Sequence, residues 1–408
     1  MNVCILSDKY PPDVGGLAVS TRRLAHGLAQ AGHTVCVSAP ATSVVPGDVA
    51  TSNDGGMSVF RIGVHRRADD TLADWFDHVV ALHATHRFDV IHAMYVTQPA
   101  FVAVTSARYL GLPSVISARG NDLDRTAFDP GKFSQIVWSL QNASAVTAAT
   151  TDLIRKARAL APGIEPQWIP NGVDTALFSP GPRDEALASS LNLAATPVIA
   201  FVGEARQKKG LTILLPAFAQ VSERFKRLLD SPSPSPCPLP LPILGEGGGW
   251  GVGEGRPPTL LLIGGVRKDD EPILQVFQRQ NPTLNVRVVP NVAHKELPAY
   301  YRLADVLVIP SLRDGMPNSL LEGMACERAI VASNVGGMPD VLRHGENGVL
   351  VPPGDVNALA DGLLELLTDP SRRERLGRAA RVTVESDFTP AREIERNLEI
   401  YQRVKRET

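Results

Sequence analysis

Short apolar runs alternate with helical patterns along most of this chain, and this alternation constrains its fold more than any other feature. Each run has the length and composition of one buried strand, and apolar residues recur at helical spacing in the segments between the runs. Strands that are joined through helices pair in parallel and are covered by those helices on both faces. The sequence therefore predicts an α/β fold built on parallel sheets.

The pattern runs through the chain twice. In the first round the predicted strands are residues 3–6, 34–38, 59–62, 90–92, 114–117 and 145–148. In the second round they are residues 197–202, 260–263, 286–289, 306–309 and 329–332. Because 408 residues are too many for one hydrophobic core, each round is expected to form its own domain. The polar segment 179–183 carries proline and glycine and marks the predicted boundary.

Helix signals are clearest at the two ends of the chain. The first helix is predicted over residues 19–31, with Leu24 and Leu28 on its buried stripe and Gly32 as its stop. A last helix is predicted over residues 391–404. Residues 230–258 break the rhythm, because this segment is dominated by proline and glycine and cannot form a packed element. We interpret it as a disordered surface insertion whose deletion leaves activity intact.

Charge and composition narrow the class of protein. The 41 basic and 43 acidic residues give a net charge of −2, so no surface for a nucleic acid is predicted. The four cysteines lack metal-ligand spacing, which fits a reducing compartment. The first predicted strand leaves no room for a signal peptide, and no apolar run approaches the roughly 20 residues that span a bilayer. A cytoplasmic protein is expected, with peripheral contact at the inner face of the membrane left open.

The most informative motif follows the strand at residues 306–309. A glycine-containing turn leads into a helix predicted to begin at Pro317, and the free amides of a helix N-terminus suit a phosphate or diphosphate. Asp314 lies in the turn and could face a sugar attached to that diphosphate. Glu322 lies one turn after Asn318 on the same face and could bind ribose hydroxyls. The alternative is a helix capped by the turn acid, with Glu322 in solvent.

Two other strand ends carry residues suited to an anionic ligand. Gly15 and Gly16 follow the first strand and allow close approach to the backbone, although their spacing differs from the dinucleotide fingerprint and disfavours an NAD-binding domain. A second strand ends at Gly203, and Arg206 and Lys209 follow it at the sheet edge where ligands of α/β proteins collect. A cation about 4 Å from a unit charge contributes roughly 4 kcal/mol before desolvation. Such cations suit the binding of a diphosphate.

In order and spacing, these motifs and the glycine-rich loops at residues 336–337 and 345–354 resemble the family 4 retaining glycosyltransferases, also called group 1. That family carries a Glu-x7-Glu signature, which here reads Asp-x7-Glu because Asp314 replaces the first glutamate. Glu204 stands at the position of a family arginine, and Arg119 at that of a family histidine. The resemblance implies the GT-B architecture, with two Rossmann-like parallel-sheet domains facing each other across a cleft.

The resemblance also implies a role for each part of the chain. Residues 1–180 would form the acceptor-side domain, residues 181–385 the nucleotide-sugar-binding domain, and residues 386–408 a helix that crosses back to the first domain. The implied reaction moves a sugar from a nucleoside-diphosphate sugar to a hydroxyl acceptor with retention of anomeric configuration, without a metal ion or other cofactor. The acceptor could be a saccharide, a lipid-linked molecule or a small metabolite. A nucleotide-sugar epimerase of the same fold and a degenerate sugar-nucleotide-binding protein stay open as alternatives.

By the same resemblance, catalytic roles fall to Asp314, Lys209 and Arg206. The implied donor-binding residues are Gly15, Gly16, Gly203, Val292, Gly315, Met316, Pro317, Asn318, Ser319 and Glu322. The implied acceptor-side residues are His92, Arg119, Asn121 and Asp122. A strand-end histidine such as His92 is also common as a hydrogen-bonded packing residue. Asp122 and Asp124 form an Asp-x-Asp pair, but so short a match is not interpreted as a metal site.

Overall fold

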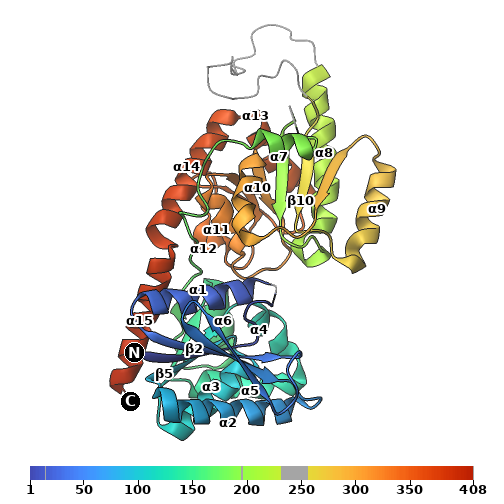
Figure 1. Cartoon of the computed structure of the whole chain (residues 1–408). Helices are drawn as coiled ribbons and strands as arrows, with labels where there is room; N and C mark the ends of the chain where they lie inside the picture. Colours follow the sequence, from blue (N-terminus) through green and yellow to red (C-terminus); the bar gives the residue numbers. More distant parts are fainter. Residues whose placement is uncertain (14, 194–195, 231–255, 408) are drawn as a thin grey trace. The chain divides into compact units, whose positions relative to one another are not determined.

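The chain divides into two compact units in the computed structural model, which describes residues 1–13, 15–193, 196–230 and 256–407 (Figure 1). Unit 1 comprises Met1–Gly172, Gly315–Pro317 and Phe388–Thr408. Unit 2 comprises Val173–Asp314 and Asn318–Asp387. Most of the insertion predicted at residues 230–258 lies outside the described residues. None of the described helices is both long enough and apolar enough to cross a membrane.

Unit 1 is built on a sheet that has eight strands in the described part of the chain, in the order β3-β4-β2-β1-β5-β6-β7-β8. The strands are β1 (Asn2–Ser7), β2 (Thr34–Ala41), β3 (Val49–Asp54), β4 (Met57–Gly63), β5 (Val90–Met94), β6 (Ser114–Ala118), β7 (Ala145–Ala148) and β8 (Gln167–Trp168). All neighbouring strands pair in parallel except β3 and β4, which form an antiparallel hairpin. The parallel sheet expected from the alternating sequence pattern is therefore confirmed.

Helices cover both faces of this sheet (Figure 1). They are α1 (Gly16–Gln30), α2 (Ala68–His86), α3 (Gln98–Leu110), α4 (Asn121–Asp124), η1 (Thr126–Phe128), α5 (Pro130–Asn142), α6 (Thr151–Leu160) and α15 (Pro390–Glu407). Helix α15 comes from the far end of the chain and packs against α1. Its Ile400, Tyr401 and Val404 are buried in one cluster with Val3 and Ile5 of β1. The last helix is thus part of the core of unit 1.

Unit 2 has a parallel sheet with the strand order β11-β10-β9-β12-β13-β14 in the described residues. The strands are β9 (Val198–Val202), β10 (Thr259–Ile263), β11 (Asn285–Val289), β12 (Val306–Ile309), β13 (Ala329–Ser333) and β14 (Val349–Val351). The helices are α7 (Glu185–Ser190), η2 (Gln207–Lys209), α8 (Leu211–Asp230), η3 (Lys268–Asp270), α9 (Glu271–Gln280), η4 (His294–Glu296), α10 (Leu297–Leu303), α11 (Asn318–Ala325), α12 (Met338–Val341), α13 (Val356–Thr368) and α14 (Pro370–Asp387).

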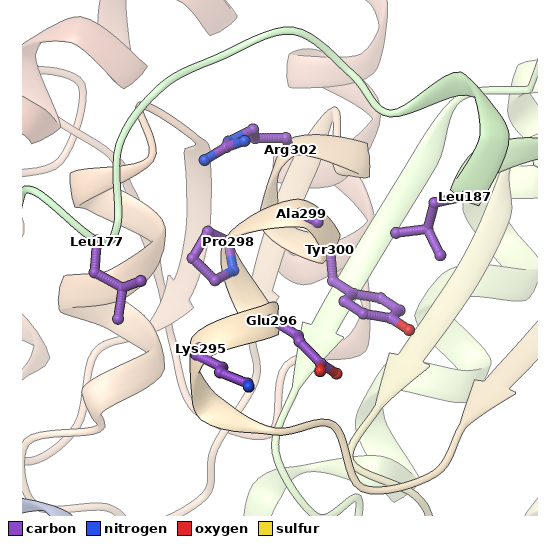
Figure 2. A pocket seen from close by; sticks show the side chains of 8 residues that line it. All are labelled: Leu177, Leu187, Lys295, Glu296, Pro298, Ala299, Tyr300 and Arg302. Atoms are coloured by element: carbon purple, nitrogen blue, oxygen red, sulfur yellow. The ribbon is translucent and has the colours of Figure 1, made fainter.

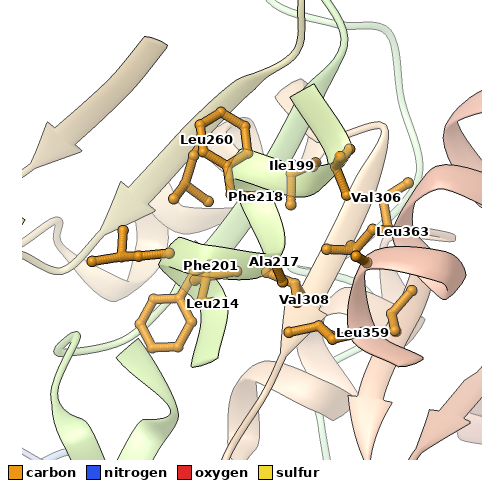
Figure 3. Packing of buried hydrophobic residues seen from close by; sticks show 14 of the residues in the cluster. Ile199, Phe201, Leu214, Ala217, Phe218, Leu260, Val306, Val308, Leu359 and Leu363 are labelled. Carbon is orange, nitrogen blue, oxygen red and sulfur yellow. The ribbon is translucent and has the colours of Figure 1, made fainter. Parts of the chain in front are cut away.

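The core of unit 2 forms where α8 and α13 pack on one face of this sheet (Figure 3). Phe218 on α8 and Leu363 on α13 are fully buried against Phe201 of β9 and Val308 of β12. Because both faces of a parallel sheet are buried, its strands are nearly continuous apolar runs, which is why the sequence pattern was easy to interpret here.

Three strands of the structure, β3, β8 and β14, were not predicted from the sequence. Strand β3 is almost wholly exposed and polar, so it lacks the apolar signal on which the prediction depended. Strands β8 and β14 contain only two and three residues. The first helix also begins at Gly16, earlier than predicted, and Gly15 of the glycine-rich loop is its N-cap residue.

Candidate active site

The order of strands in unit 2 defines where a ligand fits best. The chain builds β9, β10 and β11 outward in one direction and then returns to place β12 on the other side of β9. The loops after β9 and β12 therefore run in opposite directions. The place between them, where the strand order reverses, is called the switch point, and α/β sheets bind ligands in the crevice there. Lys209 follows β9, and Asp314 follows β12.

A glycine brings these two loops together. Gly210 follows η2 with a positive φ of 82°, a conformation that L side chains rarely adopt. A Cβ atom at this position would lie 1.9 Å from the carbonyl oxygen of Pro310. Only glycine therefore lets the end of the Lys209 turn pack against the start of the loop after β12.

Lys209 and Asp314 form an ion pair between the lysine Nζ and the carboxylate Oδ2. Ser311 Oγ also donates a hydrogen bond to this Oδ2, over 3.3 Å. The lysine and aspartate side chains are 22% and 15% exposed, so the pair is partly shielded from water but reachable. The structure thus brings together two predicted catalytic residues, one cation and one carboxylate, at the switch point.

Arg206, the third predicted catalytic residue, lies at the same sheet edge beside Glu204. Its Nη1 is 3.3 Å from Glu204 Oε2, and its side chain is 28% exposed. Its Nε is buried and makes no hydrogen bond among the described residues. Glu204, which stands at the position of a family arginine, is therefore the ion-pair partner of the nearby Arg206.

Glu322 lies on α11, which begins at Asn318, one residue after the predicted start. Its carboxylate is buried, and each of the two oxygens has a different partner. Tyr301 OH donates to Oε2 over 2.7 Å, and His294 Nε2 lies 3.1 Å from Oε1. Burial and the charge of Glu322 raise the pKa of Tyr301 well above its usual value. The alternative of a solvated Glu322 is therefore wrong, because the side chain is only 8% exposed.

The other predicted donor-binding residues are spread over both units. Gly203 directly follows β9, Val292 lies between β11 and η4, and Asn318 and Ser319 open α11. Gly315, Met316 and Pro317 are buried and group with unit 1, where the Met316 carbonyl accepts a hydrogen bond from Asn171 Nδ2 over 3.2 Å.

The glycine-rich loop of unit 1 leads from β1 into α1. Gly15 has a φ of 134°, which favours glycine, and Gly16 is the first residue of the helix. The preceding part of the loop is anchored by Tyr10, whose OH donates to Asp54 Oδ2 over 2.8 Å. Arg22 of α1 holds the same carboxylate with two hydrogen bonds of 2.7 and 2.9 Å. The end of the unpredicted strand β3 thus fixes this loop.

Replacing Asp54 by asparagine is expected to lower the free energy of unfolding at pH 7 by about 1–2 kcal/mol. The hydrogen bonds from Arg22 lower the pKa of Asp54 below its usual value. A lowered carboxylate pKa stabilises the fold above the unfolded-state value of about 4, and this contribution is lost as the pH falls further. Urea unfolding at a series of pH values between 7 and 3 should therefore show the gap between wild type and variant shrinking with acid.

Asp69→Asn is the control for this measurement, since Asp69 pairs with the exposed Arg67, and the two side chains are 67% and 73% exposed. Little change is expected for it at any pH. A gap for Asp54→Asn that stays constant down to pH 3 would show that the charge of Asp54 is not the source of its effect.

His92 is fully buried in unit 1, which differs from the prediction that it lines a cleft. Its Nδ1 lies 2.5 Å from Tyr401 OH on α15, and its Nε2 lies 2.7 Å from Ser117 Oγ. Burial and the nearby charge of Arg119 lower the pKa of His92 to about 3, so the ring is neutral at pH 7. The structure therefore supports the alternative that His92 is a hydrogen-bonded packing residue.

The side chain of Arg119 is also buried within unit 1, at 7% exposure. Its Nη2 contacts Asn171 Oδ1 and lies 3.6 Å from Glu393 Oε1 on α15. Arg23 of α1 binds Glu393 Oε2 over 2.6 Å, and the Gly172 amide donates to the same oxygen over 2.9 Å. Arg119 therefore fixes the start of α15, whereas the prediction placed only its loop on the acceptor side and gave its side chain no role.

Asp122 is buried as well, and its carboxylate accepts hydrogen bonds from backbone amides. The donors include Gly120, at 2.7 Å from Oδ1, and Val96, at 3.1 Å from Oδ2. Asp124 instead forms an ion pair with Lys156. Asn121, at the start of α4, is exposed. Within the described ranges, no group of three or more His, Cys, Asp or Glu side chains has an arrangement that could hold a metal ion.

Two residues near the predicted site residues, Asp8 and His294, were not singled out from the sequence. Asp8 follows β1 and accepts a hydrogen bond of 2.8 Å from Thr97 Oγ1, and burial raises the pKa of its carboxyl to about 6. His294 follows β11 and contacts Glu322. Asp8 directly follows β1, and His294 opens η4 after the loop that leaves β11. Both segments start from the carboxyl edge of a parallel sheet, and this position was the available signal.

Unit 2 also contains a cavity of about 390 Å³ beside η4 and α10 (Figure 2). It is lined by Leu177, Leu187, Lys295, Glu296, Pro298, Ala299, Tyr300 and Arg302. None of the predicted site residues lines this cavity, so we do not assign the active site to it.

Comparison with known proteins identifies the class to which this fold and site belong. Residues 251–383 match the family described as glycosyl transferases group 1, and residues 14–177 match glycosyltransferase family 4. A D-inositol 3-phosphate glycosyltransferase 1 of Catenulispora acidiphila is 28% identical over 331 residues, which are 79% of this chain and 73% of that protein.

Solved structures agree on the fold. A sucrose-phosphate synthase from Thermosynechococcus elongatus matches with a TM-score of 0.80 and 23% identity over 100% of both chains. The Anabaena protein HepE, solved in complex with UDP-glucose, matches with a TM-score of 0.73 and 18% identity over 99% of this chain and 100% of that one. The two parallel-sheet units thus form a GT-B fold. The chain belongs to the group 1 glycosyltransferases of family 4.

Proposed function

We propose that this glycosyltransferase moves a sugar from a nucleoside-diphosphate sugar to a hydroxyl group of a saccharide, lipid-linked or small-molecule acceptor. The anomeric configuration is retained, and no metal ion takes part. The main structural support for this proposal is the Lys209–Asp314 ion pair at the switch point of unit 2. Relatives support the donor class, because HepE was solved with UDP-glucose. The name of the Catenulispora relative describes a glycosyl transfer involving an inositol phosphate.

In this proposal the donor diphosphate binds Lys209 and Arg206, together with amides at the start of α11. These groups stabilise the negative charge that develops as the diphosphate leaves, which is electrostatic catalysis. Asp314, released from Lys209 by the incoming phosphates, accepts hydrogen bonds from the sugar hydroxyls. Glu322 accepts from the ribose. The acceptor binds at the carboxyl edge of the unit 1 sheet, near the Gly15–Gly16 loop.

The test is incubation of the purified chain with UDP-, GDP- and ADP-sugars and a panel of alcohols that includes phosphorylated ones. Product NMR reports the anomeric configuration, and a parallel reaction contains EDTA. Retained configuration and an unchanged rate in EDTA support the proposal. An inverted product, or loss of activity in EDTA with recovery in manganese, contradicts it. Epimerised donor without transfer indicates an epimerase, and donor binding without turnover indicates a sugar-nucleotide-binding protein.

Glu322→Gln is expected to weaken binding of the donor nucleotide about 10- to 30-fold, because a neutral amide is a poorer acceptor for ribose hydroxyls than a carboxylate. The amide oxygen still accepts from the buried Tyr301 OH, so the fold should persist. Calorimetric titration with UDP measures the loss. Glu346→Gln removes the same charge from an exposed site in unit 2 and should leave the affinity unchanged. Equal affinities of wild type and Glu322→Gln would refute the ribose role.

The cellular location is a further proposal. We propose that the protein acts in the cytoplasm, because nucleoside-diphosphate sugars are the proposed donors and the cysteine pattern fits reducing conditions. Membrane contact stays a prediction, and sedimentation of the chain with vesicles of anionic lipid tests it.

A further inference from the structure

The two oxygens of Glu322 have partners of very different accessibility. Oε2 accepts from Tyr301 OH, and the tyrosine is fully buried. Oε1 faces His294, whose side chain is 46% exposed. A ligand that reaches Glu322 from solvent therefore meets the histidine side of the carboxylate. Because a carboxylate oxygen has two lone pairs, Oε1 can accept from a ligand hydroxyl and from His294 at once.

The His294 ring is held in place on its other side by Phe178. The ring centroids lie 5.1 Å apart at an interplanar angle of 67°, an edge-to-face contact. Phe178 is itself buried and also packs edge-to-face against Tyr301, with centroids 5.8 Å apart. The histidine is thus oriented by a buried aromatic pair and a buried carboxylate, although nearly half of its side chain stays open to solvent.

The chemistry of the ring suits a nucleoside. When Nε2 carries the proton and donates to Glu322, the neutral ring keeps Nδ1 as an acceptor. Among the residues that the structure describes, this Nδ1 has no hydrogen-bond partner, whereas both ring nitrogens of His92 are bonded. A ribose hydroxyl or a base N–H is the kind of donor that Nδ1 can accept.

We propose that His294 binds the nucleoside part of the donor and shares Oε1 of Glu322 with a ribose hydroxyl. This inference rests on the proposed function, since it assigns a further residue to the same donor site. Tyr301 and Phe178 cannot take this role, because both are buried. They act as positioning residues that hold Glu322 and His294 in register for the ligand.

His294→Ala is expected to weaken UDP binding about tenfold, as the loss of one hydrogen bond and a ring contact implies. Calorimetry with UDP, 2′-deoxy-UDP and inorganic pyrophosphate locates the contact. The affinity for pyrophosphate should not change, and the preference of the wild type for UDP over 2′-deoxy-UDP should shrink. His294→Gln keeps an N–H that can donate to Glu322 and should recover part of the affinity.

His344→Ala is the matched control, since His344 is the other histidine of unit 2 and is exposed. It should bind UDP like the wild type, and thermal melting should show all variants folded. Wild-type UDP affinity in a folded His294→Ala overturns the inference and leaves the proposed function standing. An equal loss for pyrophosphate also overturns it, because the effect would then not come from the nucleoside. A wild-type chain that binds none of UDP, GDP and ADP overturns the proposed function itself.

Discussion

Replacing Lys209 by alanine is expected to lower the turnover number of sugar transfer by about 100-fold or more at saturating donor. A cation near a departing diphosphate contributes roughly 4 kcal/mol of Coulomb energy at a partly screened site, and each 1.36 kcal/mol corresponds to a factor of ten in rate. Desolvation removes part of this, which leaves about two orders of magnitude. The change is measured as the initial rate of product formation, with the sugar nucleotide that the wild-type enzyme accepts as donor.

Lys208→Ala serves as the control, because it removes the same charge from the neighbouring residue of η2. Its turnover is expected to stay within about threefold of the wild type, well below the effect of one charge-assisted hydrogen bond. Lys209→Arg keeps a cation but changes its geometry, so it should fall between the two. A Lys209→Ala enzyme that is folded and turns over like Lys208→Ala would contradict the proposed mechanism.

Asp314 makes the Lys209 experiment more informative. The alanine variant removes the ion pair between Lys209 and Asp314, and this loss acts on the loop after β12 as well as on the ligand. The double variant Lys209→Ala/Asp314→Asn removes both charges and should regain stability without regaining turnover. Recovery of turnover in the double variant would mean that the lysine acts only by neutralising Asp314.

Glu393→Ala is expected to destabilise unit 1 by about 3–5 kcal/mol, because it leaves buried cations without a counter-charge. Glu393 is 3% exposed, and its carboxylate contacts Arg23, Arg119 and the Gly172 amide. Burial opposes its ionisation, but the charges of Arg23 and Arg119 outweigh it and lower the pKa of Glu393 below its usual value. The contribution is therefore complete at neutral pH and is lost as the pH falls below about 4.

Urea unfolding followed by tryptophan fluorescence measures this effect, because Trp75, Trp138 and Trp168 lie in unit 1. Glu395→Ala is the control on the same helix, since Glu395 is exposed and its ion pair with Arg392 lies at the surface. Its effect should stay within about 0.5 kcal/mol. A Glu393→Ala midpoint equal to that of Glu395→Ala would show that the buried network does not hold α15 in place.

The sheet edge at which Lys209 and Asp314 lie could be predicted from the sequence, because both residues lie close to strand ends in the chain. Lys209 and Asp314 each follow an apolar strand, and adjacent parallel strands end at the same edge of a sheet. Their meeting as an ion pair follows from the strand order, which the sequence pattern does not contain. Glu322 was found by its spacing from Asp314, but its burial beside Tyr301 was not.

The burial of His92 and Arg119 was not predicted from the sequence, and the reason is sequence separation. His92 bonds to Tyr401 across 309 positions, and Arg23 bonds to Glu393 across 370. A strand-end histidine or arginine looks the same in the sequence whether it faces solvent or a distant helix. Only the packing of α15 on unit 1 decides that His92 and Arg119 point inward.

The sequence alone determined most of the buried strands, since apolar periodicity is a local property of the chain that follows from burying one face of each element. It also determined which strand ends carry charged residues. The tertiary structure decided which of those residues meet and which are buried. Which residues meet depends on the strand order and on the packing of α15 against unit 1. A buried charge is stable only beside a partner, and the fold decides which partner lies next to it.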